Sequence, residues 1–282
     1  MRDEMLKTAI VYDFDGTLAP GNIQEHSLIP QVLGLSPADF WGEVSEEARK
    51  EDADSILTYL RLILEKAEAR GIHITCELLA QHGASTPFFA GVPQFFERIN
   101  RYAEERGLLL EHYVVSSGNE EMIRACRIAH AFKRIFACRY HYDGEGIARS
   151  AAVAINYTSK TQFLFRINKG IDNHWDDRAV NAWIPPEERP LPFSRMIYLG
   201  DGDTDIPSMK MVRHQGGFSI AVFDPIRWAR LEQQEKVYKL IAEDRAHFVV
   251  PADYTEGSQL DITIKGLIGR IARDQAGYRG GS

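Results

Sequence analysis

Two aspartates separated by one phenylalanine stand at the end of an apolar run in the segment AIVYDFDGTLAP (9–20). The apolar run is typical of a buried strand, and a Gly-Thr turn follows Asp15 directly. Carboxylates this close together repel each other unless a cation or a proton compensates them. Asp13 and Asp15 could therefore divide into a nucleophile and a proton donor whose environments separate their pKa values.

Two later apolar runs also end in residues that suit phosphate or a metal. Ser116, Ser117 and Gly118 follow one run, and the acidic segment GDGDTD (200–205) follows the other. The hydroxyl and backbone N–H groups of a Ser-Gly turn that opens a helix, together with Lys160, suit an anion. The carboxylates offer only oxygen ligands, which favours Mg²⁺ and disfavours zinc.

The elements that must position these residues form an alternating pattern. Short apolar runs predict strands at 8–14, 110–116, 196–200, 218–223 and 247–251. Amphipathic patterns predict helical segments at 93–106, 119–131, 204–214, 225–244 and 257–273. This alternation predicts an α/β fold with a doubly wound, Rossmann-like parallel sheet. Because ligands bind at the carboxyl ends of such strands, the polar residues should meet in one cleft.

One long segment interrupts the alternation. Residues 20–86 give only helical patterns, notably DSILTYLRLILEKAEAR (54–70) with its apolar stripe. The segment closes at Pro87, after which the core pattern resumes. We therefore expect an all-helical cap at 20–86 inserted into a core formed by 1–19 and 87–282.

Two further segments of the core are irregular. Residues 139–159 carry an Asp-Gly turn between strand-like runs, which predicts a hairpin. Residues 170–195 contain four prolines, which predicts a loop rather than a helix.

Composition limits the class of protein and its partners. The formal net charge is -7, and this argues against a nucleic acid as partner, since phosphate backbones require clustered basic residues. No apolar run approaches the ~20 residues of a membrane helix, and the polar start MRDEMLK lacks the apolar stretch of a signal peptide. Three cysteines without a CxxC pair predict reduced thiols and a cytoplasmic location. No pattern in the sequence sets an oligomeric state.

Taken together, the motifs resemble those of the haloacid dehalogenase superfamily of phosphohydrolases. The resemblance rests on four motifs in order, DFDGT (13–17), VVSSG (114–118), Lys160 and GDGDTD (200–205). The helical insertion between the first and second motifs is similar to the cap of the phosphoserine phosphatase-like branch. Such a cap implies a lid that closes over the leaving group, excludes water and sets specificity.

The resemblance also implies roles for the first pair of carboxylates. Asp13 would attack phosphorus and form an aspartyl-phosphate. Asp15 would protonate the leaving oxygen and then activate the water that hydrolyses the intermediate. Since dehalogenases of the superfamily lack this acid and its ion-pumping ATPases carry threonine there, Asp15 points to phosphate ester chemistry.

The phosphate-binding groups implied by the resemblance come from the second and third motifs. Ser116 would hold phosphoryl oxygens from the turn that also contains Ser117 and Gly118. Lys160 would hold them as well. Lys169 is a second candidate for this lysine, and Lys160 is favoured because it precedes the helical pattern and could point into the cleft.

The implied metal site combines the first and last motifs. Asp13 would contribute its carboxylate and Asp15 its backbone carbonyl. Asp201 would bind Mg²⁺ directly, and Asp205 would act through a coordinated water or orient the lysine. Asp203 lies between these two, and the pattern assigns it no role.

The sequence therefore predicts a Mg²⁺-dependent phosphomonoester hydrolase that acts on a small phosphate ester through an aspartyl-phosphate. A phosphotransferase or phosphomutase would carry the same motifs and differ only in the acceptor of the phosphoryl group. A non-catalytic phosphate-binding regulatory protein is the alternative from another class. It is disfavoured because a protein that only bound phosphate would have no need of the acid Asp15.

Overall fold

The protein is built on a seven-stranded sheet with the strand order β4-β3-β2-β1-β5-β6-β7, seen in a computed structural model that describes residues 5–202 and 204–279. The strands are β1 (Leu6–Tyr12), β2 (Leu108–Asn119), β3 (Arg134–Tyr142), β4 (Ala148–Val153), β5 (Met196–Gly200), β6 (Phe218–Phe223) and β7 (Phe248–Pro251). All neighbouring strands are parallel except β3 and β4. The predicted parallel α/β core and the predicted hairpin are therefore confirmed.

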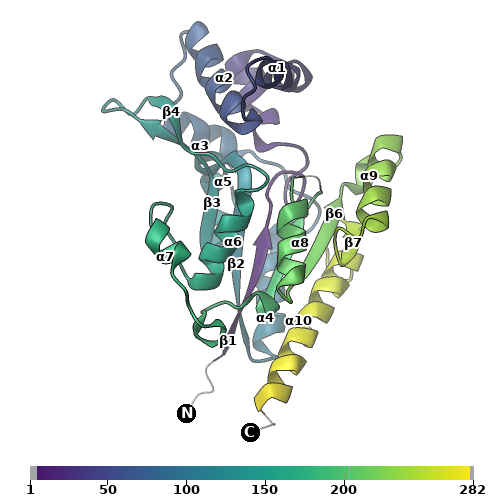
Figure 1. Ribbon diagram of the computed structural model, residues 1–282. Helices are drawn as coiled ribbons and strands as arrows, with labels where there is room; N and C mark the ends of the chain where they lie inside the picture. The colour runs from purple at the N-terminus through teal and green to yellow at the C-terminus, as the bar shows by residue number, and fades with distance from the viewer. Residues whose placement is uncertain (1–4, 203, 280–282) are drawn as a thin grey trace.

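Helices cover both faces of this sheet (Figure 1). Their bounds are α1 (Pro37–Lys50), α2 (Ser55–Ala69), α3 (Cys76–Ala84), α4 (Val92–Glu104), α5 (Glu120–Ala125), α6 (Lys160–Lys169), α7 (Asp177–Asn181), α8 (Ile206–His214), α9 (Leu231–Ala242) and α10 (Gln259–Arg279). On one face α6 packs against α8, and on the other α4 packs against α10. The central strand β1 is buried on both faces from Thr8 to Tyr12, which explains the apolar run over 9–12.

The helices α1 and α2 lie beyond the carboxyl ends of the strands, at the top of Figure 1. The hairpin of β3 and β4 reaches up to α2. The Tyr140 hydroxyl donates a hydrogen bond to the Leu60 carbonyl at 3.0 Å, and the Asn156 amide donates to the Asp54 carboxylate at 2.8 Å. The helix α3 packs instead against α5 of the core. The domain boundaries at 19 and 87 stay a prediction.

Three segments differ in detail from the predicted elements. The helical pattern at 119–131 contains α5, which ends at Ala125, and then a separate 3-10 turn, because Cys126 takes an extended backbone conformation. The pattern at 225–244 begins with a 3-10 turn capped by Asp224, and α9 starts only at Leu231. The proline-rich segment 170–195 contains the short helix α7, capped by Asp176.

Among the described residues, no helix is both long enough and apolar enough to span a membrane. The cytoplasmic location stays a prediction.

A buried histidine joins β1 to β2 inside the core. The His112 Nδ1 lies 2.9 Å from the Tyr12 hydroxyl, and its Nε2 lies 2.8 Å from the Asn100 side-chain oxygen. The Asn100 oxygen can only accept, which places a proton on Nε2, and the Tyr12 hydroxyl can donate to Nδ1 when burial keeps the ring neutral. Burial lowers the pKa of His112 from its ordinary value of 6.5 to about 3.

This burial predicts a pH dependence of stability. The folded chain keeps His112 neutral, while the unfolded chain protonates it below pH 6.5. His112 therefore stabilises the folded chain above pH 6.5, and this stabilisation is lost as pH falls toward 3. The variant His112→Gln should lack this pH dependence. Between pH 6.5 and 4.5, the free energy of unfolding of the variant, measured with urea, should fall less steeply than that of the wild type by about 1 kcal/mol per pH unit.

The control is His141→Gln, which replaces an exposed histidine and should retain the wild-type slope. If His112→Gln also retained the wild-type slope, the buried ring would not be the group that titrates.

Candidate active site

The polar residues predicted to act together do meet at the carboxyl ends of three neighbouring strands. Asp13 directly follows β1, and Asp201 directly follows β5. The segment Ser116–Gly118 lies near the end of β2, on the other side of β1. Tyr12 of β1 is level with Val114 of β2 and Leu199 of β5, so the three strand ends stand side by side.

Lys160 forms the centre of this group. It is the first residue of α6 and is fully buried, with its Nζ 3.0 Å from Asp13 Oδ1 and 2.8 Å from Asp205 Oδ1. Burial alone would lower the pKa of the Lys160 ammonium, but the carboxylates of Asp13 and Asp205 outweigh burial and raise it. Lys160 is therefore a permanently charged group between two acids.

The alternative lysine is engaged elsewhere. Lys169 lies at the other end of α6, and its Nζ donates hydrogen bonds to the carbonyls of Val180 and Ala182, both at 2.6 Å. The structure thus brings Lys160, and not Lys169, against Asp13.

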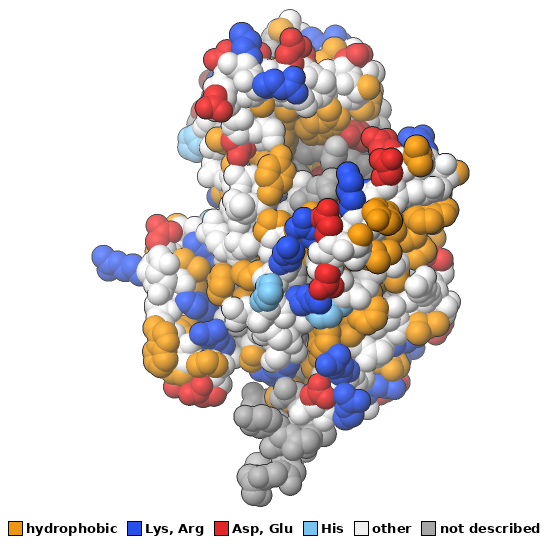
Figure 2. Space-filling model, turned by 45° about the vertical axis from the view of Figure 1, so that its right-hand side comes forward, with side chains coloured by type: hydrophobic (Ala, Val, Ile, Leu, Met, Phe, Trp, Pro, Cys, Tyr) orange, Lys and Arg blue, Asp and Glu red, His pale blue; other side chains and the backbone are white. Residues whose placement is uncertain are grey.

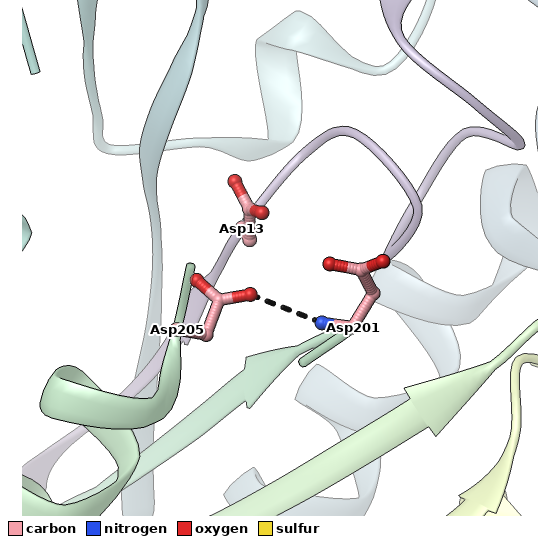
Figure 3. A group of neighbouring side chains, drawn as sticks. All are labelled: Asp13, Asp201 and Asp205. Carbon is pink, nitrogen blue, oxygen red and sulfur yellow. Dashed lines mark hydrogen bonds between the residues drawn. The ribbon is translucent and has the colours of Figure 1, made fainter. Parts of the chain in front are cut away.

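Three carboxylates surround a common space (Figure 3). Asp13, Asp201 and Asp205 each offer an oxygen atom, and these atoms all lie within 4.8 Å of one another. Burial, followed by the nearby charge of Asp205, raises the pKa of Asp13 well above its usual range. Burial likewise raises the pKa of Asp201, although the Lys236 ammonium opposes this. Bringing these groups together favours a proton or a cation, and an all-oxygen set fits Mg²⁺.

Within this set, Asp205 already accepts three hydrogen bonds. Its donors are Lys160, the Tyr198 hydroxyl at 2.6 Å and the Asp201 backbone N–H at 3.1 Å. A carboxylate held this firmly suits the orientation of Lys160 better than direct coordination of a metal. Asp203 lies outside the described residues.

Asp15 has a different environment from Asp13. Its Oδ1 accepts a hydrogen bond from the Ile23 backbone N–H at 2.8 Å. Burial, with a smaller contribution from the charge of Glu25, raises the pKa of Asp15 to about 7, although the Ile23 N–H lowers it. A carboxyl group with this pKa can both donate and accept a proton near neutral pH.

The Ser-Ser-Gly segment belongs to the last residues of β2, so the predicted turn that opens a helix is instead strand, with an irregular register after Val115, and α5 begins at Glu120. Ser116 is fully buried, and its hydroxyl accepts a hydrogen bond from the Gly118 backbone N–H at 2.9 Å. Ser117 borders the cavity, and its buried hydroxyl has no hydrogen-bond partner within the part of the chain that the structure describes. The Ser117 carbonyl accepts a hydrogen bond from the Tyr59 hydroxyl at 2.6 Å, which links the end of β2 to α2.

A cavity of about 520 Å³ is bordered by five of these residues, Asp13, Asp15, Ser117, Lys160 and Asp201. Figure 2 shows that the surface is hollowed between the upper helices and the body below them. The cavity wall also includes residues that no motif indicated, among them Glu25, Trp41, Tyr59, Arg227 and Lys236. Trp41 donates a hydrogen bond from Nε1 to Glu25 at 2.7 Å. No sequence pattern indicated Glu25 or Lys236, because neither lies in a motif or at a predicted strand end.

Comparison with known proteins now places the chain in a family. The sequence model of the haloacid dehalogenase-like hydrolases matches residues 10–210. The chain belongs to this family. An uncharacterized protein of Borreliella burgdorferi is similar to it, with 26% identity over 286 residues that cover 89% of this chain and 93% of the relative.

Solved structures share the fold. A probable phosphoserine phosphatase from Vibrio cholerae has a TM-score of 0.57 and 14% identity, covering 97% of this chain and 69% of its own. A phosphoserine phosphatase solved as a phospho-aspartyl intermediate analogue has a TM-score of 0.54 and 16% identity. The match covers 93% of this chain and 99% of the phosphatase chain. The predicted haloacid dehalogenase superfamily and phosphoserine phosphatase-like fold are confirmed, and the predicted enzyme of the phosphatase type agrees with the family.

The buried lysine generates a stability prediction. Lys160→Met would leave Asp13 and Asp205 buried without their shared cation, so the free energy of unfolding at pH 8 in EDTA should fall by about 3 kcal/mol. The deficit should shrink at pH 5, because a proton can replace the lost cation on Asp13, whose pKa is already raised. Urea denaturation at the two pH values measures both effects.

Lys169→Met is the matched control. It loses two hydrogen bonds to carbonyls, which should cost about 1 kcal/mol and equally at both pH values. A loss for Lys160→Met that was the same at pH 5 and pH 8 would contradict the assigned role of Lys160 as a counter-charge.

Proposed function

We propose that the protein is a Mg²⁺-dependent phosphomonoester hydrolase that acts on a small phosphate ester through an aspartyl-phosphate on Asp13. The observation that carries this proposal is one cavity that combines Asp13, oriented by Lys160, with an Asp15 whose pKa is about 7. A nucleophile and a nearby acid-base group are the two functions that such a reaction requires.

In the first step Asp13 acts as the nucleophile. The Phe14 backbone N–H and Lys160 hold its Oδ1 at 2.8 Å and 3.0 Å, which leaves Oδ2 as the attacking oxygen. A bond forms between this oxygen and phosphorus while the ester P–O bond breaks. The leaving oxygen takes the proton of Asp15 and departs as an alcohol.

In the second step Asp15 acts as a base. Its carboxylate takes a proton from a water molecule, which attacks phosphorus and breaks the bond to Asp13. Inorganic phosphate is released, and both aspartates return to their starting states. A pKa of about 7 suits both roles, since the group must be protonated in one step and ionised in the next.

The remaining residues hold charge in place. Lys160 and the segment Ser116–Gly118 at the end of β2 would bind phosphoryl oxygens, with Ser117 on the cavity wall. Asp13, Asp201 and the backbone carbonyl of Asp15 would hold Mg²⁺. Asp205 would orient Lys160 or act on the metal through a coordinated water. Bound there, Mg²⁺ would neutralise the acidic cluster and the charge on the phosphoryl group.

We further propose that residues 20–86 act as the cap of a core formed by 1–19 and 87–282. The support is the position of α1 and α2 beyond the strand ends and the presence of Trp41 and Tyr59 in the cavity wall. Helices in this position would exclude water and contact the alcohol part of the substrate.

The first test uses the two aspartates. Asp13→Asn should abolish phosphate release from a generic aryl phosphate, because the amide is not a nucleophile. Asp15→Asn should slow release by about 10²- to 10⁴-fold, the usual contribution of a general acid-base group, and leave Mg²⁺ binding largely intact. Wild-type activity should vanish in EDTA and return with MgCl₂. If Asp13→Asn were as active as the wild type, the proposal would fail.

A second test concerns the close approach of Gly16 to Asp201. Gly16 has φ +72°, and a Cβ there would lie 2.6 Å from Asp201 Oδ2. Gly16→Ala should therefore displace this carboxylate and raise at least tenfold the MgCl₂ concentration that gives half-maximal phosphate release.

Gly71→Ala is the matched control, because Gly71 has φ +70° and no atom lies within 4 Å of a Cβ built there. Both variants should lose about 1 kcal/mol of stability from the left-handed backbone, and only Gly16→Ala should change the Mg²⁺ requirement. If the two variants needed the same MgCl₂ concentration, Asp201 would not be a metal ligand.

A further inference from the structure

A lysine remote from every motif reaches the proposed metal site. Lys236 lies on α9, and its Nζ is 2.9 Å from Asp201 Oδ2, across 35 positions of sequence. Both residues border the active-site cavity. The ion pair therefore places a positive charge on the carboxylate that is proposed to bind Mg²⁺ directly.

Lys236 is more exposed to solvent than Lys160. The Lys160 side chain is 1% exposed, whereas those of Lys236 and Asp201 are 27% and 29% exposed. The helix that carries Lys236 buries only Val237 and Leu240 among its residues. A lysine at the rim of a cavity can exchange a carboxylate for water, because water can solvate the ammonium.

Charge makes this ion pair and a bound metal mutually unfavourable. A divalent cation at Asp201 would stand within a few ångströms of the Lys236 ammonium, and like charges that close repel by several kcal/mol in a partly buried site. The ammonium also occupies one of the two oxygen atoms that Asp201 can offer. Metal and ammonium thus compete for the same carboxylate.

We propose that Lys236 is an intramolecular competitor of the metal: it neutralises Asp201 until Mg²⁺ arrives, and Mg²⁺ binds by displacing it. The inference rests on the metal site of the proposed function. It implies that Lys236 stabilises the protein without metal and weakens its apparent affinity for Mg²⁺.

Calorimetric titration of the full chain with MgCl₂ tests the proposal without any measurement of turnover. Lys236→Met should bind Mg²⁺ about tenfold more tightly than the wild type, because the competitor is gone. Lys239→Met is the matched control: it removes the same charge from an exposed position of the same helix and should leave the dissociation constant within about twofold of the wild type. Lys236→Arg, which retains the cation, should also remain near the wild type.

Thermal unfolding gives a second readout. In EDTA, Lys236→Met should melt below the wild type, because Asp201 has lost its counter-charge. In excess MgCl₂, it should melt at or above the wild type, since tighter binding stabilises the folded state more.

The outcomes separate this inference from the function on which it rests. If the wild type and Lys236→Met bound Mg²⁺ with equal affinity, or if the variant bound it more weakly, Lys236 would not be a competitor, and the metal site itself would stand. If neither protein bound Mg²⁺, both proposals would fail.

Discussion

The structure depends on the compensation of negative charge at the carboxyl end of its sheet. Asp13, Asp201 and Asp205 bring oxygen atoms within 4.8 Å of one another in a place that water reaches poorly. The buried ammonium of Lys160 neutralises part of this charge, and the Tyr198 hydroxyl and backbone N–H groups supply dipoles. Lys160 at the bottom of the site and Lys236 at its rim supply two positive charges against three carboxylates. The remaining negative charge is the physical reason for proposing a divalent cation there.

The ion pair of Lys160 with Asp205 also joins parts of the fold. The parallel pairing of β1 with β2 and β5 sets three strand ends level, so that residues far apart in sequence stand next to one another. Lys160 begins α6 and Asp205 immediately precedes α8, and these two helices pack together on one face of the sheet. Their ion pair therefore lies where two helices and the central strand meet. Folding of the core and assembly of the site depend on the same contacts.

Sequence patterns predicted those features that depend on local apolar patterns and on the order of the strands. The apolar runs located five of the seven strands, and the predicted hairpin at 139–159 covers β4 but only the second half of β3, which begins at Arg134. The residues that follow the predicted strands identified Asp13 and Asp201, because parallel strands bring their carboxyl ends together. These patterns did not predict the residues that reach the cavity from elsewhere. Glu25 comes from a 3-10 turn and Lys236 from α9, whose placement over the site depends on tertiary packing. The break in the helical pattern after Ala125 also has a tertiary cause, since Ile128 turns inward to become buried.

Burial divides the site into two layers with different freedom. At the bottom, Asp13, Lys160 and Asp205 are almost completely buried and hold one another, so their geometry cannot vary without loss of stability. At the rim, Asp201 and Lys236 are partly exposed, and the proposed displacement of Lys236 by a metal takes place there. The bottom layer therefore suits the proposed nucleophile, whose atoms must stay in place. The rim suits groups that adjust to a metal or a substrate, because water there can solvate their charge.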